Sequence, residues 1–120
     1  MRKSLVACLA ITLLISTNLS AQVKGSRVTS EPGITRQLVI DERTVQVAHS
    51  TYHPGAVEPP GPHSFDVVIV PLSQGTMDVK IAGKSVAWKV GEAFFIPRGV
   101  EHTIANHGKT PVDFVSIRIP

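Results

Sequence analysis

The chain has 120 residues, with twelve Lys and Arg against nine Asp and Glu and a formal net charge of +3 at neutral pH. This length supports one compact domain and leaves no room for a second, because domains of about 100 to 150 residues are the commonest size. Arg2 and Lys3 belong to a targeting segment, and without them the formal charge is only +1. No basic stripe remains, so nucleic acid is excluded as a partner.

The first 21 residues have the order of a secretory signal peptide. Arg2 and Lys3 precede an apolar run over residues 5–15, and a small polar segment ends at Ala21. The sequence therefore predicts a signal peptide over residues 1–21 that is cleaved near Ala21. The protein is expected to be exported, periplasmic or secreted, with no membrane contact after cleavage.

Two other interpretations of this segment are weaker. An uncleaved transmembrane anchor is disfavoured because the apolar run is shorter than the ~20 residues that cross a bilayer. Lipidation at Cys8, in "LVAC", is disfavoured because most of the apolar run follows this cysteine instead of preceding it. Since Cys8 is the only cysteine, a chain cleaved near Ala21 forms no disulfide.

Residues 22–33, "QVKGSRVTSEPG", mix Gly, Ser, Pro and charged residues without periodicity and are predicted to be a flexible tether. Residues 34–120 contain short β-branched runs between Pro, Gly, Asn and Asp, and no ten-residue window has helical spacing. Eight strands are predicted, at "TRQLVI", "TVQVAHSTY", "FDVVIVPL", "TMDVKIAG", "KSVAWKV", "EAFFIP", "EHTIAN" and "PVDFVSIRI". Short strands at this spacing are typical of an antiparallel sandwich or small barrel, so one all-β domain is expected over residues 34–120.

The second and third predicted strands are separated by residues 53–64, "HPGAVEPPGPHS". Its four prolines cannot lie in a central strand, and we expect an ordered loop at the mouth of the barrel. The strand that follows contains "VVIV", which is apolar throughout and is expected to lie inside.

The stretch "GEAFFIPRGVEHTIAN" has the spacing G-x5-P-x-G-x2-H-x3-N, met by Gly91, Pro97, Gly99, His102 and Asn106. A tight turn through the proline and the second glycine, which tolerates a positive φ, would fix the direction of the imidazole at the start of the next strand. This spacing resembles the second motif of the cupin superfamily. The resemblance covers roughly residues 43–119 and implies a single-domain jelly-roll β-barrel, also called a double-stranded β-helix.

The first motif of that superfamily, G-x5-H-x-H-x3-4-E-x6-G, is degenerate here. Aligned on Gly55 and Gly75, its two histidine positions are Gly61 and His63, and its glutamate position is Val68. Two of the four usual metal ligands are therefore missing. The complete set would imply Fe, Mn, Ni, Zn or Cu, because imidazole and carboxylate suit several divalent ions.

With His63 and His102 alone, the metal site is expected to be weak or absent. Asp66 is a candidate third ligand because it shares strand parity with Val68, and two His with one carboxylate form the ligand set of non-haem Fe(II) sites. The alternative is a rim carboxylate that is solvated or paired with Arg98 or a lysine. Two residues of the proline-rich loop could also supply a ligand, namely Glu58 and His53.

The expected pocket is ringed by His63, His102 and a set of apolar side chains, Phe65, Val68, Trp88, Phe94 and Phe95, for which a plain core role is the competing interpretation. The leading hypothesis is an exported protein that binds a small molecule in its barrel. A metal-dependent oxygenase or isomerase using His63, His102 and Asp66 is the first alternative, and a protein-interaction barrel is the second. A homodimer is also predicted, because "PVDFVSIRI" is expected near a sheet edge.

Overall fold

The computed structural model describes residues 27–120, which contain nine strands and no helix. The strands are β1 (Arg27–Glu31), β2 (Ile34–Asp41), β3 (Gln46–Tyr52), β4 (Asp66–Pro71), β5 (Met77–Ile81), β6 (Lys84–Val86), β7 (Phe94–Ile96), β8 (His102–Asn106) and β9 (Val112–Ile119). All eight predicted strands are present, and the all-β prediction is confirmed. The predicted signal peptide over residues 1–21 lies outside the described residues.

Strand β1 was not expected, because it lies within the predicted tether. It pairs antiparallel with β2, from Arg27 opposite Leu38 to Glu31 opposite Ile34. The connection is the two-residue turn at Pro32 and Gly33, where the glycine has φ 75°. Proline followed by a glycine of positive φ is typical of a tight turn between strands, so "EPG" is a hairpin turn and not part of a linker. Of the predicted tether, only residues 22–26 lie outside the described part.

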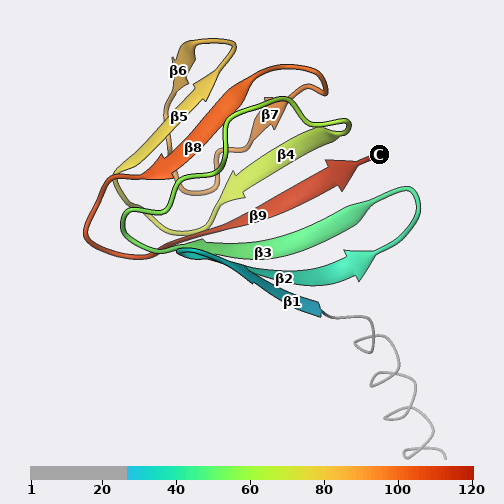
Figure 1. Ribbon diagram of the computed structural model, residues 1–120, viewed down its shortest axis with the longest axis horizontal. Coiled ribbons are helices and arrows are strands. Elements are labelled where there is room, and N and C mark those ends of the chain that lie inside the picture. Colours follow the sequence, from blue (N-terminus) through green and yellow to red (C-terminus); the bar gives the residue numbers. More distant parts are fainter. Residues whose placement is uncertain (1–26) are drawn as a thin grey trace, which may run out of the picture.

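The strands form two antiparallel sheets that face each other (Figure 1). The larger sheet has the order β1-β2-β3-β9-β4-β7, and the smaller has the order β6-β5-β8. This is the jelly-roll arrangement that the resemblance implied. Strand β9 pairs with β3 on one side and with β4 on the other. The expectation that β9 lies at a sheet edge is therefore wrong, since its backbone hydrogen-bonding groups face neighbours on both sides.

The core lies between the two sheets and is built around three aromatic rings. Phe114 of β9 contacts Tyr52 of β3 and Trp88, with ring centroids 5.0 and 5.5 Å apart. Trp88 also donates a hydrogen bond from Nε1 to the carbonyl of Ser73 at 3.0 Å. Phe94 packs edge-on against Trp88 at 6.0 Å. The expectation of a core or barrel-lining role for Trp88 and Phe94 is met as core packing.

Strand β4 shows which of its residues face inward. Val67 and Ile69 are buried at 4% and 3% exposure, and since side chains alternate along a strand, Val68 points to the outer face of the sheet. There it lies opposite Phe95, which is 50% exposed. Val68 and Phe95 are therefore not pocket residues. The run "VVIV" is apolar on both faces, so the sequence offered no alternation from which to choose the inward set.

Candidate metal centre

His102 is the first residue of β8 and is held by the turn that precedes it. The N–H of Val100 donates to the carbonyl of Pro97 at 3.3 Å, and Gly99 has φ 75°. The imidazole is 1% exposed, and its Nδ1 lies 3.3 Å from the carbonyl of Val100. A carbonyl only accepts hydrogen bonds, so in the neutral imidazole this contact places the proton on Nδ1 and leaves the lone pair on Nε2. Nε2 is buried and has no hydrogen-bond partner among the described residues.

His63 reaches the same place from the end of the proline-rich loop. Its carbonyl accepts a hydrogen bond from the N–H of Gly99 at 2.9 Å, which ties this loop to the turn before His102. The two imidazole rings lie 4.4 Å apart, centroid to centroid. The His63 imidazole also stacks on the ring of Phe65, with the ring centroids 4.6 Å apart and an angle of 11° between the planes.

The third member of the group is Glu58, from the middle of the same loop. Val57 forms an isolated bridge with Ala105 of β8, and the N–H of Glu58 donates to the carbonyl of Ile104 at 2.9 Å. These contacts pin the loop along β8, as expected of an ordered loop, and bury Glu58 to 8% exposure. Its carboxylate is thereby directed at the two histidines.

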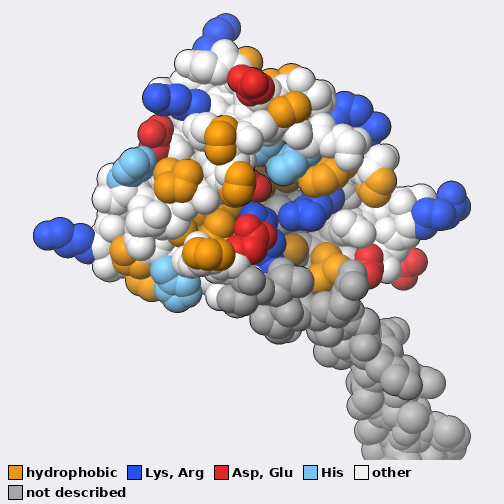
Figure 2. Space-filling model, viewed as in Figure 1, with side chains coloured by type: hydrophobic (Ala, Val, Ile, Leu, Met, Phe, Trp, Pro, Cys, Tyr) orange, Lys and Arg blue, Asp and Glu red, His pale blue; other side chains and the backbone are white. Residues whose placement is uncertain are grey.

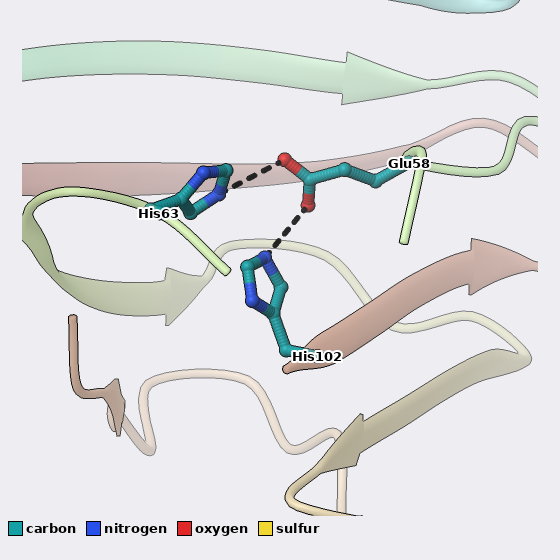
Figure 3. A group of neighbouring side chains, drawn as sticks. All are labelled: Glu58, His63 and His102. Atoms are coloured by element: carbon teal, nitrogen blue, oxygen red, sulfur yellow. Dashed lines mark ion pairs between the residues drawn. The ribbon is translucent and has the colours of Figure 1, made fainter. Parts of the chain in front are cut away.

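The three side chains converge on one point (Figure 3). Glu58 Oε1 is 3.5 Å from His63 Nε2, and Glu58 Oε2 is 3.8 Å from His102 Nε2. One ligand atom from each residue lies within 4.8 Å of the other two. Ligand atoms around one ion at about 2.1 Å are roughly 3 to 3.5 Å apart, so a small contraction of this group would suit a transition metal. The group can hold a metal ion through two imidazoles and one carboxylate.

Asp66 does not belong to this group. Its carboxylate accepts hydrogen bonds from the backbone N–H of Arg98 at 2.8 Å and from the Arg98 guanidinium at 3.2 Å. The backbone N–H contributes most to holding the pKa of the Asp66 carboxyl below its usual value. Asp66 has the parity of Val68, which is the outward parity, and the alternative prediction of a rim carboxylate paired with Arg98 is the correct one. The carboxylate that joins the two histidines is that of Glu58 instead.

The parity of β4 also corrects the motif alignment. The first cupin motif allows three or four residues between its second histidine and its glutamate, and the shorter spacing places the glutamate position at Val67. Val67 faces inward and Val68 does not. The carboxylate of this site therefore comes from Glu58, which precedes His63 in the chain, while the inward position on β4 is apolar.

The surroundings of the group are charged. The Arg36 guanidinium lies 3.4 Å from Glu58 Oε1, donates to the Tyr52 hydroxyl at 3.1 Å and is 3.8 Å from Glu31 Oε1. Burial, and then the charge of Glu58, raise the pKa of Tyr52 well above its usual value. Burial lowers the pKa of His63, although Glu58 opposes this shift. His63 is therefore neutral at neutral pH, which is the form that binds a metal.

A cavity of about 500 Å³ opens beside the group. The residues that line it include Glu58, His63 and Phe65, together with two arginines, Arg36 and Arg118. Figure 2 shows basic and acidic side chains gathered in the hollow at the centre of this face. Of the predicted pocket residues, Phe65 and His63 line this cavity.

The family profile described as "Cupin domain" matches residues 48–118. The chain belongs to the cupin family. It is 29% identical to beta-alanine degradation protein BauB of Pseudomonas aeruginosa over 94 residues, which cover 77% of this chain and 99% of that protein. It is also 29% identical to germin-like protein subfamily 2 member 2 of Arabidopsis thaliana over 110 residues, 86% of this cupin and 47% of the relative. This cupin spans about half the length of the germin-like relatives.

Solved structures agree with this assignment. A cupin domain from Bordetella pertussis is 31% identical and superposes with a TM-score of 0.63, covering 77% of this cupin and 98% of that chain. KdgF from Halomonas sp. superposes with a TM-score of 0.69 at 23% identity, over 78% and 87% of the two chains, and shows the fold alone. Among residues 27–120 there is no helix long and apolar enough to cross a membrane.

Proposed function

We propose that this cupin binds one divalent transition-metal ion through Glu58, His63 and His102 and presents it to a small molecule in the adjoining cavity. The observation that carries the proposal is His102 Nε2, a buried nitrogen for which residues 27–120 offer no hydrogen-bond partner. Its lone pair is directed at the carboxylate of Glu58, 3.8 Å away. Buried polar atoms are nearly always paired, and an ion bound at this point would satisfy the nitrogen.

Each of the three ligands has a partner that orients it, as is usual around protein metal sites. The Val100 carbonyl fixes the tautomer of His102, and Phe65 fixes the plane of His63. Arg36 holds the Glu58 carboxylate at 3.4 Å. Imidazole and carboxylate ligands suit Fe, Mn, Ni, Zn and Cu. Such an ion, when bound, would act as a Lewis acid toward a small molecule in the cavity.

The test is the metal content of purified protein, with His102→Ala and Glu58→Gln as variants. We expect about one equivalent of a transition metal in the wild type, loss of the metal in His102→Ala, and a large reduction in Glu58→Gln. Asp66→Asn is the control, because Asp66 is bonded to Arg98 and should leave the metal in place. Well under one equivalent in the wild type, with no thermal stabilisation by added Fe, Mn, Ni, Zn or Cu, would overturn the proposal.

A second candidate is a metal-free pocket that binds a small molecule. Its support is that Glu58 already has two partners at ion-pair distance, Arg36 at 3.4 Å and His63 at 3.5 Å. In that case Glu58→Gln would lower stability equally with and without a chelator. Catalysis extends the first candidate: two His and one carboxylate form the ligand set of non-haem Fe(II) oxygenases, and isomerases are the other class to assay.

We also propose that the protein is exported after cleavage near Ala21. The support is the order of charged, apolar and small residues over residues 1–21. Cleavage there would leave β1, which begins at Arg27, intact. An intact mass that starts at or near Gln22 in protein from the periplasm or medium is expected. A species that retains Met1, or that carries lipid on Cys8, would contradict the proposal.

Self-association as a homodimer is a further proposal. The edge strands of the larger sheet are β1 and β7, so these replace β9 as the strands that could pair with a second copy. Light scattering at tens of micromolar should give a dimer mass, and a monomer mass would contradict this.

A further inference from the structure

Arg118 is the charged residue of the cavity that the metal proposal leaves without a role. It is the penultimate residue of β9, and its guanidinium lies 5.1 Å from the centre of the Phe65 ring. The same ring stacks on His63 at 4.6 Å. The guanidinium and a proposed metal ligand thus contact the same aromatic ring. Arg118 and His63 line the same cavity of about 500 Å³.

The two arginines of the cavity differ in their partners. Arg36 is neutralised by Glu58 at 3.4 Å and Glu31 at 3.8 Å, and it donates to the Tyr52 hydroxyl. Arg118 has no carboxylate within ion-pair distance among residues 27–120. Its surroundings are nevertheless half-buried, and burial followed by the charge of Arg36 lowers the pKa of Arg118. A partly desolvated guanidinium without a counter-ion is costly, and an anion that entered the cavity would offset this cost.

A bound metal ion would make the cavity more favourable to an anion. Without metal, Arg36 and Arg118 balance Glu31 and Glu58. A divalent ion on Glu58 and the two histidines would add two positive charges to this balance. The positive excess would lie at the ion and at Arg118, and both Arg118 and the ligand His63 line this cavity.

We propose that the cavity takes a small carboxylic acid whose carboxylate pairs with Arg118, while the neighbouring atoms of the molecule face Glu58 and His63. The planar guanidinium matches a carboxylate with two parallel hydrogen bonds. Phe65 and Pro59 supply apolar surface for the carbon skeleton. A hydroxyl or keto oxygen next to the carboxylate would then face the metal position, so 2-hydroxy and 2-keto acids are the class that fits. This inference rests on the proposed function for its second contact, but the carboxylate contact needs only Arg118.

The test compares acids with their uncharged amides on the metal-loaded full chain. Lactate and pyruvate are titrated by calorimetry against lactamide and pyruvamide, and we expect binding of the acids alone. Arg118→Met keeps the apolar stem of the side chain and removes its charge, and it should weaken acid binding about 10- to 100-fold, because hydrogen bonds to charged groups contribute this much. Arg43→Gln, an exposed arginine outside the cavity, is the charge-matched control and should bind like the wild type.

The outcomes separate this inference from the metal proposal. Arg118→Met should retain the metal content of the wild type, since Arg118 is not a ligand. A metal-loaded protein that binds acids and amides equally, or not at all, would overturn the inference and leave the metal site standing. A protein without metal whose acid binding is still lost in Arg118→Met would support the carboxylate contact and overturn the metal proposal.

Discussion

The turn at residues 97–100 and the loop at residues 53–64 each deliver a histidine to the site, but they are held in different ways. The turn closes on itself through the Val100 to Pro97 hydrogen bond and the positive φ of Gly99. The loop has one such local bond, from Ala56 to His53. It is otherwise held by distant residues, through the bonds of residues 55–58 to β8, of His53 to Gly33 and of Gly99 to His63. The conformation of a locally closed turn can be predicted from a few neighbouring residues, whereas that of a loop held by a distant strand cannot.

The largest effect should come from Asn106, which joins the loop to the rest of the barrel. Its buried amide donates to the carbonyls of Tyr52 and Thr110, both at 2.9 Å, and accepts from the N–H of Gly108. Asn106→Ala would leave these groups unpaired, and we expect a loss of about 2 to 4 kcal/mol in the free energy of unfolding, measured in urea. At low pH, where the introduced carboxyl group is protonated, Asn106→Asp keeps the acceptor oxygen and should lose less stability than Asn106→Ala. A loss below about 1 kcal/mol in Asn106→Ala would show that these three side-chain hydrogen bonds contribute little to the stability of the barrel.

Acidification should release the metal ion, because it acts on both proposed histidine ligands at once. Protons compete with the ion for the imidazoles, and burial lowers the pKa of His63, so metal affinity should be kept at neutral pH and lost on acidification. Titration of bound metal between pH 8 and pH 5 measures this. His107→Asn, which changes an exposed histidine of the β8–β9 connection, is the control and should titrate like the wild type. A site that kept its ion unchanged at pH 5 would contradict ligation by these imidazoles.

A matched pair of glycines compares the rigidity of the two regions. Gly99 in the turn has φ 75° and Gly55 in the loop has φ 83°, and an added Cβ would meet nothing within 4 Å at either position. The cost of alanine is therefore only that of the left-handed backbone, about 1 to 2 kcal/mol at each site. Urea unfolding of Gly99→Ala and Gly55→Ala should give similar losses. A loss for Gly99→Ala alone would mean that the loop relaxes where the turn does not.

The smallest effect should come from Asp66, which joins the turn to β4 through Arg98. Because the pair is at the surface, Asp66→Asn should cost little stability at neutral pH. The pKa of Asp66 is lower in the folded protein than its usual value of 3.8, so the stabilisation is present above that pH and is lost as the pH falls through the lowered pKa. Thermal midpoints of the wild type and the variant should therefore converge in acid. Thermal midpoints that move further apart in acid would contradict the predicted pH dependence of the Asp66 contribution.

The sequence by itself determined the strand content and the position of His102. Alternating runs such as "TMDVKI" and turn residues such as Pro97 and Gly99 act over a few neighbours, so the eight strands and the second motif could be predicted without contacts. The hairpin turn at Pro32 and Gly33 was equally local but was hidden by the polar composition around it. The central place of β9 could not be predicted, because the sequence does not state which strands pair.

Only the tertiary structure decided which carboxylate joins the two histidines. Asp66 was favoured by its short spacing from His63, but the parity of β4 turns it outward to Arg98. Glu58 gained its place because backbone bonds to Ile104 and Asn106, more than 40 positions later in the chain, align the loop with β8. The physical reason is that a side chain's direction follows from its own φ and ψ angles and strand parity, whereas its neighbours in space follow from which distant backbone groups satisfy one another's hydrogen bonds.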